Sequence, residues 1–247
     1  MQALAIMYHD VVENGDFESS GFPGEGANVY KLRREDFECH LDAIAGVGRP
    51  VLLTFDDGGV SSLHPIADLL ESHGWGGHFF ITTDRIGTPG FLTEAQLREL
   101  HRRGHIVGSH SRSHPTRMAA LTRAELDGEW RESLARLSGV LGDAVKVASV
   151  PGGYYSREVG ESAAAAGVEA LFTSEPTARV GMLKGCRVFG RYVVQRGMQP
   201  EWSAGFAAGS RSRCWRQSAL WKAKRLAKAL GGGAYLRLRQ AILERKG

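Results

Sequence analysis

Short apolar runs alternate with longer amphipathic stretches along most of this chain. The apolar runs predict strands at residues 3–8, 51–55, 77–82, 105–109, 145–150 and 168–172. Between them, apolar positions recur with a helical period and predict helices at residues 34–45, 61–73, 93–103, 122–138 and 156–166. Alternating strands and helices indicate a parallel α/β fold, in which functional residues gather at the carboxyl ends of the strands.

Two adjacent carboxylates follow directly after one of these runs. Asp56 and Asp57 end the strand predicted at 51–55, and Gly58 and Gly59 come next. Two such charges side by side repel, so one must be neutralised by a cation or by a raised pKa. A metal ion bound to one carboxylate, with the other free to move protons, would resolve the conflict. The alternative is that the pair only caps the N-terminus of a helix.

A pair of histidines follows another predicted strand. His110 and His114 come directly after the apolar residues Ile106 and Val107. Their spacing of four puts both imidazoles on one side of a helical turn or tight loop, where they can share an ion. With Asp57 they predict a site of two histidines and one carboxylate that keeps a position open for water, which is typical of a catalytic metal site. The alternative is that both are ordinary polar loop residues.

Three segments together resemble one protein family. The segments TFDDG at 54–58, HSRSH at 110–114 and VPGGY at 150–154 are similar to motifs of the polysaccharide deacetylases, carbohydrate esterase family four, which include the chitooligosaccharide deacetylases. The resemblance covers residues 3–195, and the C-terminal half is atypical. It implies a distorted (β/α) barrel of about seven parallel strands. It also implies a metal-dependent hydrolase that removes acetyl groups from sugars.

The resemblance assigns roles to the first two motifs. Asp56 would be the general base that takes a proton from water at the metal. Asp57, His110 and His114 would hold a divalent ion. Zinc is the default ion for such ligands, and Co²⁺, Ni²⁺ and Mn²⁺ are alternatives.

The third motif departs from the family pattern. The backbone N–H of Gly152 would help to bind the oxyanion, and Tyr154 would contact the substrate. However, Ser149 stands where the family usually carries an arginine that orients the base. Arg191, near the position of a late family motif, is the candidate to replace that arginine.

The family's late histidine, which protonates the leaving amine, is also missing, because no histidine follows His114. His9, at the end of the first predicted strand, is the candidate substitute acid. The alternative for His9 is a structural role. The remaining histidines are predicted to be ordinary structural residues: His40, His64, His73, His78, His101 and His105. The Gly-rich segment 13–28 that follows His9 is predicted to be either a substrate lid or a disordered insertion.

Composition and charge narrow the setting. The chain has 247 residues, 43% hydrophobic and 23% charged, which suits one soluble barrel-sized domain, predicted here at 1–209. Three cysteines, odd in number and far apart, favour a reducing compartment. With no export signal or membrane-spanning run evident, we expect a cytoplasmic protein.

The predicted second region, 210–247, is a basic tail. It holds eleven Lys or Arg and one Glu, a net charge of +10, whereas the preceding residues hold 20 basic and 26 acidic residues, a net charge of −6. Its apolar positions recur at helical spacing: Trp215, Ala219, Leu220, Ala223, Leu226, Ala227 and Leu230. A basic amphipathic helix with tryptophan predicts peripheral binding to an anionic membrane surface at the inner membrane face. The alternatives are a helix that closes the barrel and, less favoured because the acidic body repels phosphates, a nucleic-acid site.

The sequence therefore predicts a metal-dependent hydrolase that removes an N-acetyl group from a sugar, in a glycan or lipid-linked glycan precursor. Two alternatives stay open. One is an O-acetyl esterase or N-deformylase on the same site, because an ester needs the missing acid less than an amide does. The other is a sugar-binding module without catalytic activity.

Overall fold

The computed structural model describes residues 1–223, and most of the predicted tail lies outside the described residues. Within this range, one nine-stranded sheet has the strand order β11-β1-β4-β5-β6-β7-β8-β10-β9. Its strands are β1 (Ala5–Tyr8), β4 (Leu52–Phe55), β5 (His78–Ile81), β6 (Ile106–Ser109), β7 (Val147–Ser149), β8 (Ala170–Phe172), β9 (Gly181–Leu183), β10 (Cys186–Phe189) and β11 (Tyr192–Val193). Neighbouring strands are parallel except β9 and β10.

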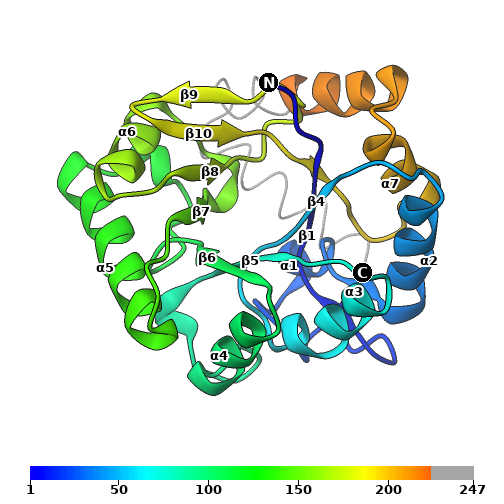
Figure 1. Cartoon of the computed structure of the whole chain (residues 1–247), viewed down its shortest axis with the longest axis horizontal. Coiled ribbons are helices and arrows are strands. Elements are labelled where there is room, and N and C mark those ends of the chain that lie inside the picture. Colours follow the sequence, from blue (N-terminus) through cyan, green and yellow to red (C-terminus); the bar gives the residue numbers. More distant parts are fainter. Residues whose placement is uncertain (224–247) are drawn as a thin grey trace.

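The sheet curls, and helices lie around its outside (Figure 1). These are α2 (Arg34–Ala45), α3 (Asp68–Ser72), α4 (Glu94–Arg102), α5 (Arg123–Leu141), α6 (Arg157–Ala165) and α7 (Pro200–Ala207). The predicted distorted (β/α) barrel is thus confirmed, with eight parallel strands in the described part instead of about seven.

Every strand and helix predicted from the apolar pattern has a counterpart. The helix predicted at 61–73 is divided into a 3₁₀ turn (Val60–Ser62), a π turn (Leu63–Ala67) and α3, because Pro65 lacks the amide proton that a regular helix needs. The sequence did not predict the short elements β2 (Val11–Val12), α1 (Glu25–Asn28) and β3 (Leu32–Arg33). It also did not predict β9, β10, β11 or α7.

The two faces of the sheet form two hydrophobic clusters. Tyr8, Phe55 and Phe79 belong to the larger cluster, in which Phe55 stacks on each of the other two. Phe80 and Phe172 belong to the smaller one, together with Ala5, Ala170 and Phe189. Successive side chains of a strand point to opposite faces, so Leu52, Thr54 and Asp56 share the face of the smaller cluster. This alternation points Asp56 into the barrel.

A seam lies between the two ends of the curled sheet, and one interrupted segment crosses it. β10 pairs with β8, β11 pairs with β1, and only Gly190 and Arg191 separate β10 from β11. The chain thus passes from β10, next to one end of the sheet, to β11 at the other end. A side chain at position 190 could not be accommodated, because its Cβ would lie 2.3 Å from the carbonyl oxygen of Glu175.

A further helix covers this seam from the outside, and it is helical from 211 to 223, the last described residue. Gln217 donates from Nε2 to the carbonyl of Val193 at 2.8 Å and accepts from its N–H at 3.0 Å, so it pairs with the free edge of β11. Ser218 donates to the carbonyl of Pro176 at 2.7 Å. Trp215 and Leu220, both assigned to the predicted apolar stripe, are 72% and 55% exposed. No helix of residues 1–223 is long and apolar enough to cross a membrane.

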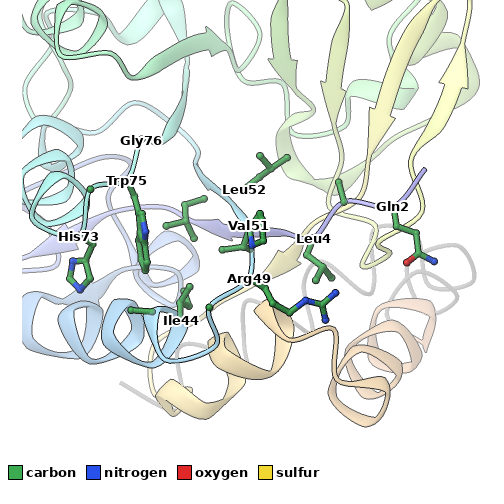
Figure 2. Close-up of a pocket in the computed structure, with 15 residues that line it drawn as sticks. Gln2, Leu4, Ile44, Arg49, Val51, Leu52, His73, Trp75 and Gly76 are labelled. Carbon is green, nitrogen blue, oxygen red and sulfur yellow. The ribbon is translucent and has the colours of Figure 1, made fainter.

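A groove of about 980 Å³ opens at the amino ends of the strands (Figure 2). Leu4 precedes β1, Leu52 begins β4, and Gly76 precedes β5, so these lining residues mark the end of the barrel opposite the predicted site. This end of a barrel usually serves stability and not catalysis.

Candidate metal and active site

Asp57, His110 and His114 come together at the carboxyl ends of β4 and β6. The Asp57 Oδ1 atom lies 3.4 Å from Nε2 of His110 and 3.5 Å from Nε2 of His114. One ligand atom from each of the three residues lies within 4.8 Å of the other two. The first two motifs, about fifty residues apart in sequence, therefore converge on one point.

The donor set fits a divalent ion. Two atoms bound tetrahedrally to zinc at about 2.0–2.1 Å are separated by about 3.3–3.4 Å. The separations of 3.4 and 3.5 Å in the structure match this spacing. Two imidazoles and one carboxylate also leave room for water or substrate at the ion.

The backbone around these ligands is unusual. Asp57 and His114 have φ values of 77° and 58°, and Ser111 has 64°, in the left-handed region that most non-glycine residues avoid. Such conformations persist only where the surroundings enforce them, and they concentrate at functional sites. The sequence allowed either a helical turn or a tight loop for the two histidines, and the structure places them on a tight loop.

Glu129 of α5 holds the histidine loop. Its carboxylate is 5% exposed and accepts from the N–H groups of Arg112 and Ser113 at 3.0 and 2.9 Å and from the Ser113 hydroxyl at 2.6 Å. The sequence reasoning missed this residue. A signal was present, because Glu129 lies beside Trp130 within the apolar face of the helix predicted at 122–138.

Asp56 pairs with Arg191 inside the barrel. The guanidinium is fully buried and donates to Oδ1 of Asp56 at 2.6 Å and to Oδ2 at 2.8 Å. It also donates to the Thr173 carbonyl and the Thr54 hydroxyl. A bidentate pair of this kind fixes the orientation of a carboxylate. The residue named as the candidate for the missing arginine is thus in contact with the candidate base.

The two carboxylates are both held in the ionised form. Burial alone raises the pKa of Asp56, but the charge of Arg191, the charge of His110 and the Arg191 hydrogen bonds lower it further than burial raises it. Burial also raises the pKa of Asp57, and the hydrogen bond from His110 with the nearby imidazoles lowers it well below its usual range. Burial and the neighbouring His110 lower the pKa of His114, which keeps that ring neutral and able to bind a metal.

Ser149, the residue in place of the family arginine, contacts one residue of the carboxylate motif and one of the histidine motif. Its hydroxyl lies 2.5 Å from Nδ1 of His110 and donates to Oδ1 of Asp56 at 3.2 Å. The serine is fully buried at the end of β7. The sequence identified this position only as a departure, because nothing in the pattern indicates which side chains meet it.

His9 lies beside the site at the end of β1. Its ring packs on Tyr30 with centroids 4.7 Å apart, and its buried Nδ1 atom has no hydrogen-bond partner in residues 1–223. The imidazole is close enough to help lower the pKa of both Asp56 and Asp57. The loop-carbonyl bond of the structural alternative is not made through Nδ1 in residues 1–223, and the catalytic role of His9 stays a prediction.

The segment 13–28 folds over the same end of the barrel. Phe22 packs against His114 with ring centroids 4.8 Å apart. The buried carboxylate of Asp10 accepts from Ser20 of this segment at 2.6 Å and from Ser61 at 2.8 Å, so it ties the segment to the loop after Asp57. Burial raises the pKa of Asp10. The segment is therefore folded against this end of the barrel, and its role as a substrate lid stays a prediction.

The third motif forms the turn after β7. Gly152 has φ 66°, and a Cβ there would approach the carbonyl oxygen of Thr116 to 3.1 Å, so the turn lies against the loop that follows His114. The ring of Tyr154 faces the guanidinium of Arg117 at 5.8 Å. The roles predicted for Gly152 and Tyr154 stay predictions.

Comparisons with known proteins agree with this arrangement. YxkH of Bacillus subtilis (strain 168), whose name assigns it provisionally to the polysaccharide deacetylases, is 27% identical over 194 residues. Those residues are 70% of this chain and 64% of YxkH, so the chain spans less than two thirds of that relative.

Solved structures share the fold. The deacetylase PplD of Streptococcus pyogenes, solved with acetate, superposes with a TM-score of 0.65 at 18% identity, over 81% of this chain and 96% of PplD. IcaB of Ammonifex degensii gives 0.66 at 20% identity, over 84% and 97%. A polysaccharide deacetylase of Bacillus cereus gives 0.69 at 17% identity, over 84% and 69%.

The sequence profile of one family matches residues 45–171, just over half of the chain, and this range includes both carboxylates, both histidines and the Pro-Gly turn. The chain belongs to the polysaccharide deacetylase family.

Proposed function

We propose that this protein is a metal-dependent hydrolase that removes the N-acetyl group from a sugar of a glycan or glycan precursor. The observation that carries the proposal is the convergence of Asp57, His110 and His114 beside an ionised Asp56 that Arg191 holds in place. Membership of the polysaccharide deacetylase family supports the acyl group and the sugar. Zinc is the first candidate ion.

When bound, such an ion supplies Lewis-acid chemistry, lowering the pKa of water and polarising the acyl carbonyl. Asp57, His110 and His114 hold it there. Asp56, ionised and oriented by Arg191, takes the proton of the attacking water. The N–H of Gly152 donates to the oxyanion.

The amine must be protonated as it leaves, because an amide anion is a poor leaving group. His9 is the proposed acid, and its free Nδ1 atom and its proximity to both carboxylates support this role. Tyr30, packed on the ring, would hold the imidazole in place.

The direct test of the function is acetate release from N-acetylated oligosaccharides. The full chain should release acetate, lose this activity on treatment with a chelator and regain it with zinc or cobalt. Acetate release that a chelator leaves intact would contradict the proposal. Binding of these sugars without any release would favour the sugar-binding alternative.

The acyl group can be tested with His9→Ala. If His9 protonates the leaving amine, the variant should lose about 10²–10⁴-fold in kcat on N-acetyl sugars. The loss should be much smaller on matched O-acetyl esters, because an alkoxide leaves without full protonation. Equal activity of variant and parent on the amide would reject His9 as the acid. A parent enzyme that hydrolyses only esters, or only N-formyl sugars, would favour those alternatives.

The proposed partner of the seam helix is an anionic membrane surface, which would present lipid-linked glycan precursors at the inner membrane face. Trp215 and Leu220 point away from the barrel, and residues 211–223 hold four Lys or Arg and no Asp or Glu. The β9–β10 hairpin lies along the same edge of the molecule as this helix (Figure 1) and adds Met182, 68% exposed. Apolar anchors among cations suit an anionic leaflet. The predicted contribution of residues 224–247 lies outside the described residues.

Vesicle sedimentation tests this partner. The full chain should bind vesicles rich in anionic lipid at low salt and ignore neutral ones. Replacing Trp215 and Leu220 by Ser should weaken binding at least about tenfold, because both side chains would bury apolar area in the leaflet. Ile106→Ser is the matched control, since Ile106 is 43% exposed on another element. Equal loss in the control, or no binding by the parent, would contradict the proposal.

A further inference from the structure

Ser149 links a metal ligand to the general base through one hydroxyl group. Its Oγ atom lies 2.5 Å from Nδ1 of His110 and 3.2 Å from Oδ1 of Asp56. All three side chains are nearly inaccessible to solvent, with exposed fractions of 0, 2 and 3%. Strong local hydrogen bonds are expected at such depth, because a buried polar group without a partner is costly.

The direction of each hydrogen bond follows from the charge on Asp56. Arg191 forms a bidentate ion pair with this carboxylate, so Asp56 is ionised and can only accept hydrogen bonds. The single hydroxyl proton of Ser149 therefore points to Asp56. The lone pairs of Ser149 remain for His110, which must then carry its proton on Nδ1.

A second contact supports the same proton position on His110. The backbone carbonyl of Ser149 lies 3.3 Å from the same Nδ1 atom, and a carbonyl oxygen can only accept. Both neighbours of Nδ1 thus require an N–H there. The other nitrogen, Nε2, lies 3.4 Å from Asp57 Oδ1 and is therefore the nitrogen left to bind the metal ion.

We propose that Ser149 is a positioning residue that prepares His110 to bind the metal ion and, with the same hydroxyl, restrains the base Asp56. This inference rests on the proposed function, because it assigns His110 and Asp56 their roles there. In this chain Arg191 supplies the charge that pairs with the base, and Ser149 supplies the connection to the metal ligand.

The first readout needs no metal. Ring ¹⁵N NMR spectra of the metal-free full chain should show a proton on Nδ1 of His110. Ser149→Ala should weaken the hold on this proton, because only the carbonyl contact at 3.3 Å remains, and Ser149→Thr, which keeps the hydroxyl, should retain it. A His110 ring without a proton on Nδ1 in the parent protein would overturn the inference, whatever the protein's activity.

The second readout is metal affinity, measured by competition with a zinc-binding dye. Ser149→Ala should bind zinc about 10–100-fold more weakly than the parent, in the range expected when a ligand histidine loses its hydrogen-bond partner. Ser149→Thr should retain most of the affinity. Ser133→Ala is the matched control, because Ser133 is equally buried and bonds Ser109 Oγ at 2.7 Å without contact to His110 or Asp56.

The outcomes separate this inference from the proposed function. If the parent binds zinc tightly and Ser149→Ala binds it as well as Ser133→Ala does, Ser149 has no positioning role while the metal site stands. If the parent binds no divalent ion, the proposed function fails together with the metal half of the inference. If Ser149→Ala does not fold, Ser149→Thr and the tautomer of the parent decide.

Discussion

The two halves of the barrel wall contribute to the site in different ways. Strands β4 to β6 supply Asp56, Asp57, His110 and His114 from motifs that match the family directly. The later strands, β7 to β11, supply Ser149 where the family has an arginine, and bring Arg191 in from the seam. In this chain the candidate metal ligands come from two contiguous motifs, whereas the charge beside the candidate base comes from a separate segment that the fold brings to it.

The largest expected effect on activity comes from a change at Asp56, which follows β4. Asp56→Asn removes the base and keeps the size of the side chain, so kcat on an N-acetyl sugar should fall by about 10²–10⁴-fold. Zinc stoichiometry should stay near that of the parent, because Asp57 and the histidines remain. Loss of the metal together with activity would mean that Asp56 is a ligand, and the division of roles between the two carboxylates would be wrong.

The second half is tested at Arg191. Arg191→Met leaves Asp56 buried without its partner, which should cost about 3–5 kcal/mol in the free energy of unfolding. Urea denaturation measures this cost, and steady-state assays should show a lower kcat with a smaller change in KM, because the base is no longer oriented. Arg179→Met is the control, because Arg179 is exposed, and this change should alter stability and kcat little. A stable, fully active Arg191→Met would show that the seam arginine does not replace the family's arginine.

Asp10 is a buried carboxylate without a guanidinium partner, and its pKa is shifted in the opposite direction to that of Asp56. Asp10 is paired with hydroxyls, its Oδ2 atom has no partner in the described part, and burial raises its pKa. The folded protein therefore holds the Asp10 proton to higher pH than the unfolded chain does, so this group removes stability as pH rises through the two pKa values. Relative to Asp10→Asn, the parent should lose stability as pH rises above about 4, the ordinary pKa of an aspartate. Parallel stability–pH curves for the two proteins would contradict this.

The smallest expected effect comes from the helix at 211–223, which lies against β11. Gln217→Ala removes two hydrogen bonds to the edge of β11 and should lower the free energy of unfolding by about 1–3 kcal/mol. Activity on a soluble substrate should remain, since Gln217 bonds Val193 and not the site. An activity loss larger than the stability loss explains would mean that the helix also positions Arg191.

The sequence predicted the regular parts of the fold because each long helix and each central strand carries its own periodicity. It could not predict the seam, because β11 has only two residues and its pairing depends on β1, nearly two hundred residues away. The need for glycine at 190 comes from the close approach of Glu175 and Thr177, which no local pattern reveals.

The candidate site was predictable to a similar degree. The metal ligands follow predicted strands, and parallel strands bring their carboxyl ends together, so their convergence followed from the fold. The sequence indicates Arg191 as a candidate, but its contact with Asp56 depends on how the chain crosses the seam. The contacts of Ser149 and Glu129 depend on three elements meeting in space, so sequence spacing could not indicate them. The catalytic roles of all these residues stay predictions.

The central claim is that three converging side chains form a catalytic metal site, and metal content tests it most directly. Elemental analysis of the purified full chain should find about one divalent ion per chain, and His114→Ala should lose it. Ser133→Ala should keep it. A parent protein that holds no ion, and takes none up from zinc, cobalt or nickel solutions, would contradict the account.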